Sequence, residues 1–262
     1  MSHYPDFSEV QTFILFVGYP RSGHSLLGAL LDAHPHAIVS HELDAIDKLK
    51  EGYPQEQLYQ AIVDQAKAFK AGGSKWMGYS YQIPGTEQAW SDQLTHIGDK
   101  RGGTTSRHLE NDWSMLEKIQ SWGVSLKIIH LTRNPFDCIS TAIKKREAEQ
   151  QRSFSSVDVR RKADHFFRKA KSVDVLIQSG QYEVYTMTHE KMIRDFHVEM
   201  THLLQFLGLP PLPDYLASCE QAIFSGPNKS RTASSHWSEE NRAYVQEQMS
   251  AFPFFSHYSF DE

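Results

Sequence analysis

The segment that most constrains the fold is Gly18-Tyr-Pro-Arg-Ser-Gly-His-Ser25, which directly follows the apolar run 12–17. Its spacing is that of a phosphate-binding loop, GxxxxGK[ST], in which backbone N–H groups and a helix N-terminus face an anion. His24 replaces the lysine that normally reaches the outer phosphates of a nucleoside triphosphate. The alternative is an ordinary strand-to-helix turn, in which the glycines serve only to allow close packing. We therefore expect a phosphorylated nucleotide that is not bound as an ATPase or GTPase binds it.

Apolar runs alternate with segments of helical spacing along the rest of the chain. Strands are expected at residues 12–17, 37–40, 75–79, 125–131 and 183–188. Helices are expected at residues 25–33, 55–70, 109–122, from 135 onward, and at 155–179, 195–207 and 238–249. Residues 82–107, rich in Gly, Thr, Ser and Asp, are expected to form a long loop across a site. This order predicts a three-layer α/β fold with a central parallel sheet, in one domain over residues 1–262.

A second motif lies at residues 128–141, where a buried strand ends in Thr132-Arg133 and Asn134-Pro135 begins a helix. Ligands of parallel sheets bind at the carboxyl ends of the strands, so Arg133 is expected beside the first loop. Ser140 and Thr141, two turns into the helix, would add a hydroxyl group suited to a phosphate monoester. An arginine that caps a surface turn is the alternative. A Mg²⁺-dependent phosphoryl transferase would end this strand in aspartate, so the motif argues against that chemistry.

Composition excludes several classes of protein. The net charge of −5 does not indicate a nucleic-acid partner. The apolar runs are shorter than a membrane span, and the N-terminus lacks the pattern of a secretory signal, so a cytoplasmic protein is expected. Two cysteines exclude a disulfide framework and a cysteine-rich zinc site, and no metal site is expected.

The two motifs together resemble those of the sulfotransferases that use 3′-phosphoadenosine 5′-phosphosulfate (PAPS). The run from Pro20 to Pro35 is similar to the branch that contains tyrosylprotein sulfotransferases and many bacterial relatives. Residues 185–209 resemble the strand and helix that follow the site in that family. They end, with the following Pro210, in Gln-Phe-Leu-Gly-Leu-Pro. The resemblance implies the nucleotide-kinase-like sulfotransferase fold, PAPS as co-substrate, adenosine 3′,5′-bisphosphate (PAP) as product, and no metal.

The resemblance also implies roles for individual residues in nucleotide binding. The residues that match the loop for the 5′-phosphosulfate are Arg21, Ser22, Gly23, His24 and Ser25. The residues that match the 3′-phosphate site are Arg133 and Thr141, with Ser140 as the alternative hydroxyl. The segment that closes over the nucleotide is matched by Lys229, Ser230 and Arg231, for which a solvated turn is the alternative.

Three residues are candidates for catalysis. Glu42 falls where the branch places its catalytic base, and Lys100 falls near its catalytic lysine, which would stabilise charge on the bridging oxygen. His41 is the rival base, because an unperturbed histidine titrates near neutrality. Side chains of adjacent residues on an extended segment point to opposite faces, so only one of the two should face the sulfuryl group.

The sequence thus predicts sulfuryl transfer from PAPS to a hydroxyl or amine of a small-molecule or glycan acceptor. It does not indicate an oligomeric state. One alternative is a small-molecule kinase that uses ATP and Mg²⁺, although it would need a lysine at position 24. The other is a nucleotide-binding protein without catalysis. Two departures from the family's pattern keep this alternative open: His24 in the loop, and Thr188-His-Glu-Lys191 where the family usually has Tyr-Glu-Asp-Leu.

Overall fold

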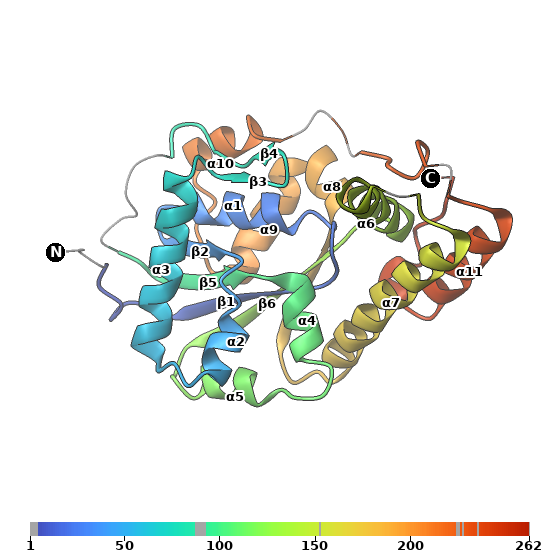
Figure 1. Cartoon of the computed structure of the whole chain (residues 1–262). Helices are drawn as coiled ribbons and strands as arrows, with labels where there is room; N and C mark the ends of the chain where they lie inside the picture. The colour runs from blue at the N-terminus through green and yellow to red at the C-terminus, as the bar shows by residue number, and fades with distance from the viewer. Residues whose placement is uncertain are drawn as a thin grey trace.

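A computed structural model describes residues 5–86, 93–151, 153–223, 226, 228–234 and 236–261. Its helices and strands, in chain order, are β1 (Thr12–Val17), α1 (His24–Asp32), β2 (Ala37–His41), α2 (Ala45–Lys50), α3 (Gln55–Ala71), β3 (Lys75–Trp76), β4 (Tyr79–Ser80), β5 (His96–Lys100), α4 (Gly102–His108), α5 (Ser114–Gln120), β6 (Ser125–Thr132), α6 (Pro135–Gln150), α7 (Ser156–Gln178), β7 (Glu183–Thr188), α8 (His189–Arg194), α9 (Phe196–Leu207), α10 (Pro213–Glu220), α11 (Glu239–Ser250) and the 3₁₀ helix η1 (Pro253–Phe255). The expected three-layer α/β architecture is confirmed (Figure 1).

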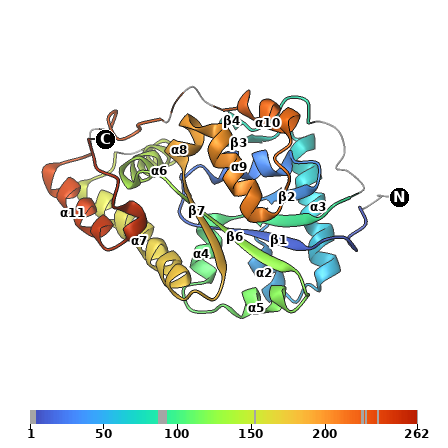
Figure 2. The same cartoon turned by 180° about the vertical axis from the view of Figure 1, so that it is seen from behind.

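The central sheet has five strands in the order β2-β5-β1-β6-β7, and every neighbouring pair is parallel. Helices α2, α3 and α5 and the end of α7 pack on one face, while α1, α9 and α10 pack on the other. Figure 2 shows the edge strand β7 beside α9 on the side turned away in Figure 1. The carboxyl ends of all five strands therefore meet along one edge.

Strand β1 is apolar throughout because it is buried on both faces. Phe13, Leu15 and Val17 enter one core, and Ile14 and Phe16 enter the other. A third apolar cluster joins α6, α7, α11 and the C-terminal segment at one end of the molecule (Figure 1). Helix α7 is long enough to contribute to this cluster with its first half and to the sheet core with its second half.

The expectation of a loop over residues 82–107 is wrong, because this segment contains β5 and α4. Residues 87–92 of it lie outside the described part of the chain. β5 lies between β2 and β1 in the sheet, yet Ile97 is its one aliphatic residue. Its polar side chains are buried by specific partners: His96 Nε2, for example, lies 2.8 Å from the carbonyl oxygen of Leu207. A search for apolar runs cannot detect a strand of this kind.

Gly98 shows how closely β5 packs against β1. A Cβ atom at this position would lie 2.2 Å from the carbonyl oxygen of Ile14, a backbone atom that cannot move aside. We expect Gly98→Ala to lower the free energy of unfolding by at least about 3 kcal/mol in chemical denaturation. Gly72→Ala is the control, since its Cβ would meet ordinary contacts at 3.4 Å. Equal stability of the two variants would contradict the packing described.

The remaining differences from expectation are local. Residues 75–79 form not one strand but the start of an exposed hairpin, β3 and β4, whose turn residues Met77 and Gly78 both have positive φ. The helix expected at 109–122 is shortened to α5, because the Asp112 carboxylate accepts the backbone N–H of Ser114 just before it begins. The helices α2, α8 and α10 were not anticipated. Both cysteines are buried and free.

Candidate active site

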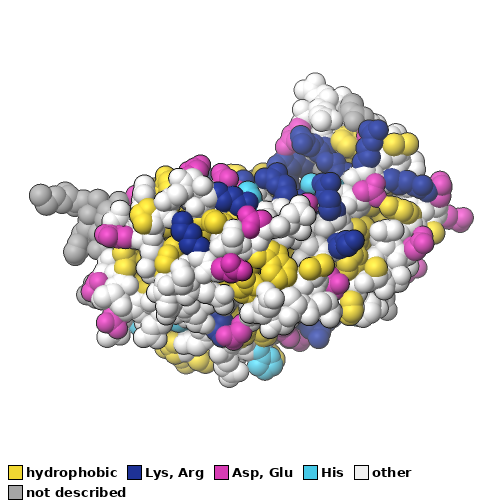
Figure 3. Space-filling model, turned by 90° about the horizontal axis from the view of Figure 1, so that it is seen from below, with side chains coloured by type: hydrophobic (Ala, Val, Ile, Leu, Met, Phe, Trp, Pro, Cys, Tyr) yellow, Lys and Arg dark blue, Asp and Glu magenta, His cyan; other side chains and the backbone are white. Residues whose placement is uncertain are grey.

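A cleft of about 720 Å³ opens at the carboxyl edge of the sheet. The loop after β1, the end of β5 with α4, the hairpin and the helices α6 and α7 all line it. Figure 3 shows Lys and Arg side chains gathered beside a notch in the surface of the molecule. The two sequence motifs therefore meet in one cavity, at the position that parallel sheets use for ligands.

The glycine loop has the conformation that an anion-binding turn requires. Gly23 has a φ of 100°, and a Cβ there would lie 2.4 Å from Nδ1 of His189, so no other residue fits. Arg21 also has a positive φ, 72°, and its side chain and that of Ser25 line the cleft. The Ser22 hydroxyl instead donates to the carbonyl oxygen of Tyr19, inside the turn. Ser22 can thus offer a ligand its backbone N–H only.

His24, in the position of the missing lysine, is a packing residue as well as part of the cleft wall. Its Nε2 lies 3.2 Å from the carbonyl oxygen of Val17, and its ring meets Phe16 edge-on. Burial, reinforced by the charge of Lys100, lowers the pKa of His24 to about 4, so the ring is neutral near pH 7. The ring has room because Gly102 lacks a Cβ, which would lie 2.5 Å from it.

Lys100 connects the loop to the catalytic candidates. Its ammonium group donates to Ser25 Oγ at 3.2 Å, to Glu42 Oε1 at 2.8 Å and to His41 Nε2 at 3.1 Å. The side chain is 1% exposed, and its stem passes Gly28, where a Cβ would lie only 2.7 Å away. Burial lowers the pKa of Lys100, and the carboxylate of Glu42 opposes this shift. The structure therefore brings together four residues from three segments that are distant in the sequence.

Glu42 is held between two cations. Its Oε1 accepts from Lys100, and its Oε2 lies 2.7 Å from an Nη atom of Arg101. Burial by itself raises the pKa of Glu42, but the charges of Lys100 and Arg101 outweigh it, so the pKa lies below its usual value of 4.5. Glu42 is ionised near pH 7 and lines the cleft.

The backbone at Glu42 is strained and is secured by Asp99. Glu42 and Asp44 have φ values of 63° and 68°, in the left-handed region that costs free energy for residues other than glycine. The buried carboxylate of Asp99 accepts the backbone N–H groups of residues 43, 44 and 45 and the hydroxyl of Ser40. Asp99 therefore fixes the turn that carries Glu42.

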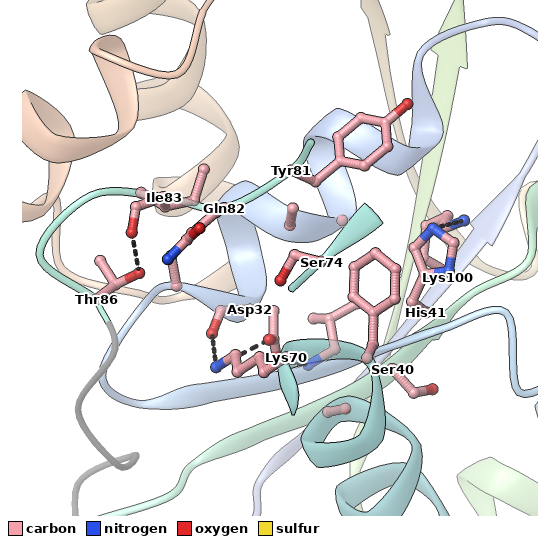
Figure 4. Close-up of a pocket in the computed structure, with 16 residues that line it drawn as sticks. Asp32, Ser40, His41, Lys70, Ser74, Tyr81, Gln82, Ile83, Thr86 and Lys100 are labelled. Carbon is pink, nitrogen blue, oxygen red and sulfur yellow. Dashed lines mark hydrogen bonds and ion pairs between the residues drawn. The ribbon is translucent and has the colours of Figure 1, made fainter. Parts of the chain in front are cut away.

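His41 faces a second, smaller cavity of about 190 Å³ (Figure 4). His41 and Lys100 lie at one end of it, and the Asp32–Lys70 ion pair, at 3.0 Å, lies along a wall. The His41 ring stacks on Phe69 with centroids 4.0 Å apart. Burial and the charge of Lys100 lower the pKa of His41 to about 4, so it is neutral near pH 7. Glu42 and His41 thus flank Lys100 and line different cavities, while Lys100 lines both.

The second motif forms the other side of the cleft. The buried Arg133 guanidinium donates to the carbonyl oxygens of Arg21 at 3.0 Å and of Asn228 at 2.5 Å. Its Nε has no hydrogen-bond partner among the described residues. The Thr141 hydroxyl donates to Ser230 Oγ at 3.0 Å, and both residues line the cleft. Arg133, Thr141 and Ser230 therefore lie on the same side of the cleft.

Three other predicted ligands do not line this cavity. Ser140 Oγ accepts from the indole N–H of Trp237 at 2.8 Å, inside the third apolar cluster. Arg231 is 2% exposed, and its guanidinium pairs with Asp137 at 2.5 Å. Lys229 is exposed outside the cleft. Arg231 thus anchors the segment 228–231 to α6 rather than presenting its charge to a ligand.

Sequence reasoning missed several residues of the site. His189 lines the cleft, and its buried Nδ1 has no partner among the described residues. Burial and the charge of Arg133 lower its pKa to about 3. Arg101 directly follows the catalytic candidate Lys100 in the sequence, and this adjacency is a signal that could have identified it. The described residues contain no cluster of three His, Cys, Asp or Glu side chains suited to a metal, and no helix among them is long and apolar enough to cross a bilayer.

A parallel α/β sheet with an anion-binding loop and a second cationic site defines a class of nucleotide-binding proteins. Within it, the chain belongs to the sulfotransferase family, whose model matches residues 13–214. No curated protein sequence matches the chain.

Solved structures confirm the fold. The sulfotransferase domain of the Synechococcus PCC 7002 olefin synthase is 19% identical, with a TM-score of 0.51 over 88% of this chain and 82% of that one. Sulfotransferase STF9 from Mycobacterium avium is 11% identical, with a TM-score of 0.54 over 94% and 77%. Mouse sulfotransferase SULT7A1, solved in complex with PAP, is 14% identical, with a TM-score of 0.50 over 94% and 85%.

Proposed function

We propose that the protein transfers the sulfuryl group of PAPS to a hydroxyl or amine of an acceptor, a small molecule or glycan. The observation that carries this proposal is the position of Lys100, which joins Ser25 of the glycine loop to the carboxylate of Glu42. A group that lies on the loop is therefore next to both a cation and a proton acceptor. A cytoplasmic location and a single domain over residues 1–262 belong to the same proposal.

The residues present fit PAPS at both of its charged ends. The loop N–H groups, Arg21 and Ser25 would hold the 5′-phosphosulfate, and Arg133 with Thr141 would hold the 3′-phosphate. The unpartnered Nε of Arg133 and Nδ1 of His189 are buried polar atoms at the cleft, and each would gain a partner from a nucleotide. A metal is not needed in this scheme, because side-chain cations neutralise the phosphates.

In the proposed reaction, Glu42 removes the proton as the acceptor oxygen or nitrogen attacks sulfur in line. The bond from sulfur to the bridging phosphate oxygen breaks, and PAP leaves with that electron pair. Lys100 stabilises the charge that develops on the bridging oxygen, and Ser25 and Arg21 hold the transferring group. His41, neutral and facing the small cavity, is the alternative proton acceptor.

The small cavity supports the choice of a small acceptor. Its walls include Val39, Ala66 and Phe69, and it opens beside His41 and Lys100 (Figure 4). A volume of about 190 Å³ has room for a group the size of one aromatic ring, since an apolar cavity of about 150 Å³ holds benzene. The reacting end of such an acceptor would lie next to Lys100.

The kinase alternative fits the cleft less well. Strand β6 ends at Thr132 and is followed directly by Arg133, and Glu42 is the one carboxylate among the described residues that line the cleft. That carboxylate is already held by two cations. We therefore expect PAP to raise the melting temperature in a thermal-shift assay and ATP with Mg²⁺ to leave it unchanged; the reverse would favour a kinase.

PAP binding tests the proposal directly. We expect PAP to bind in calorimetry and Arg133→Ala to weaken it about 10- to 150-fold, because hydrogen bonds to charged groups contribute about 1.5–3 kcal/mol. Arg133→Lys should fall in between, since it keeps the charge and loses the planar fork. Lys191→Met, which removes an exposed cation outside the cleft, is the matched control. Wild-type protein that does not bind PAP would refute the proposed function.

A further inference from the structure

The cleft carries more positive charge than the proposed nucleotide sites use. The chain has a net charge of −5, yet seven Lys or Arg residues and one acidic residue, Glu42, line the cleft among the described residues. The seven cations are Arg21, Lys100, Arg101, Arg107, Arg133, Lys145 and Lys169.

Five of these cations already have an assigned partner. Lys100 and Arg101 pair with Glu42, and Lys145 lies 3.3 Å from Glu149. Arg21 and Arg133 are the proposed ligands of the two ends of the nucleotide. Two cations of the cleft remain, Arg107 on α4 and Lys169 on α7. Neither forms an ion pair with any described residue.

Lys169 and Arg107 are held close to one another by the packing of their helices. The Ser172 hydroxyl of α7 donates to the carbonyl oxygen of Ser106 at 2.7 Å, next to Arg107 and one turn from Lys169. Lys169 is only 4% exposed, and its Nζ lies 2.8 Å from Nε2 of His165. Among the residues that the structure describes, the buried ammonium therefore has a neutral partner and no carboxylate partner.

The charges around Lys169 are predominantly of its own sign. Burial first, and then the charges of Arg107 and Arg168, lower the pKa of Lys169 to about 8, while Glu110 opposes them. Glu110 itself lies 3.6 Å from Nε of Arg168. The pKa of the neighbouring His165 falls to about 4 by burial and the charge of Lys169, so this ring is neutral near pH 7. Two like charges, one of them desolvated, cost free energy unless an anion lies between them.

We propose that Arg107 and Lys169 form an anion subsite for the acceptor, which thus carries a carboxylate, sulfate or phosphate group besides its nucleophile. This inference rests on the proposed function. Helix α4 begins directly after Lys100 and Arg101, so Arg107 extends from the catalytic side of the cleft. Gly103, at the start of α4, packs on Pro20 of the glycine loop, and Arg107 lies one helical turn beyond it.

Binding to PAP-saturated protein tests the subsite, with phenyl phosphate as the anionic probe and phenol as its neutral counterpart. We expect phenyl phosphate to bind at least about 10-fold more tightly than phenol. Arg107→Gln and Lys169→Met should each weaken phenyl phosphate about 10-fold and change the Kd of PAP by less than about twofold. Lys171→Met, an exposed cation on the same helix outside the cleft, should change neither.

Two results would overturn the inference. One is equal affinity of wild-type protein for phenyl phosphate and phenol. The other is a loss of PAP affinity in Arg107→Gln and Lys169→Met, which would assign these cations to the nucleotide. If wild-type protein failed to bind PAP, the proposed function would fail, whereas the same titration without PAP would still measure the subsite.

The stability of the ligand-free protein gives a second readout of the uncompensated charge at Lys169. Folding lowers the pKa of Lys169 from 10.5 to about 8, so the protonated group destabilises the fold below about pH 8 and this cost disappears as the pH rises to 10.5. We therefore expect Lys169→Met to have a higher Tm than wild type near pH 7 without ligand, and the difference to close at higher pH. A lower Tm of the variant near pH 7 would contradict the subsite.

Discussion

Replacing Glu42 by glutamine is expected to lower kcat about 10²- to 10⁴-fold, the range that general-base catalysis contributes. Glutamine keeps the shape of the side chain and can still accept a hydrogen bond from Lys100, but it cannot take a proton. The measurement is the rate of PAP formation with an accepted alcohol or amine. Because the variant also removes a negative charge from Lys100, whose pKa then falls further, the rate should be measured at about pH 6 as well as about pH 8.

The Kd of PAP is the control for this variant and should change by less than about twofold, because Glu42 is not a proposed nucleotide ligand. His41→Asn is the matched test of the rival base. Loss of turnover in His41→Asn with retention in Glu42→Gln would transfer the role of base to His41. Unchanged activity and PAP binding in both variants would instead support a nucleotide-binding protein without this chemistry.

Replacing Lys100 by methionine should lower kcat about 10²- to 10³-fold, the effect of removing one group that stabilises the developing oxyanion. Methionine fits the narrow passage at Gly28, and Glu42 keeps Arg101 as its partner, so the variant should fold. The rate of sulfuryl transfer in a single turnover measures the effect without product release. Lys191→Met again is the control.

The pH profile of Lys100→Met distinguishes a catalytic cation from a structural one. In the wild type the pKa of Glu42 lies below 4.5, so kcat/KM should be lost only as the pH falls through that lowered pKa. Without Lys100, burial is opposed chiefly by Arg101 alone and the pKa of Glu42 rises, so the acid limb should move to higher pH. An acid limb that stays in place would show that Lys100 does not set the ionisation of the base.

The sequence was sufficient for those parts of the fold that apolar burial determines. The strands β1 and β6 are apolar enough to be found, and they fix the parallel sheet and the site edge. Strand β5 could not be found in this way, because Asp99 and Lys100 are buried by hydrogen bonds and charge that come from distant segments. The polar side chains that prevent detection of β5 from an apolar pattern are the same ones that place it at the centre of the candidate site.

For the site, motif spacing located residues but not the directions of their side chains. The offset from Arg133 favoured Thr141 and kept Ser140 as the alternative, and helix packing turns Thr141 to the cleft and Ser140 to Trp237. Similarly, nothing in the basic segment near the C-terminus indicates that Asp137 holds Arg231. Arg107 escaped notice because its segment was expected to be a loop, and Lys169 because helical periodicity alone assigns such a residue to a solvated face.

The position of Asp99 has a consequence for how a fold of this kind can diversify. Through Asp99 and Lys100, one strand fixes both the backbone and the carboxylate of Glu42. Half of the residues that line the small cavity come from α3 and the segment around the hairpin, which are separate from β5 in the chain. Substitutions at positions such as Ala66 and Phe69 can therefore reshape the small cavity without altering the contacts that hold Glu42.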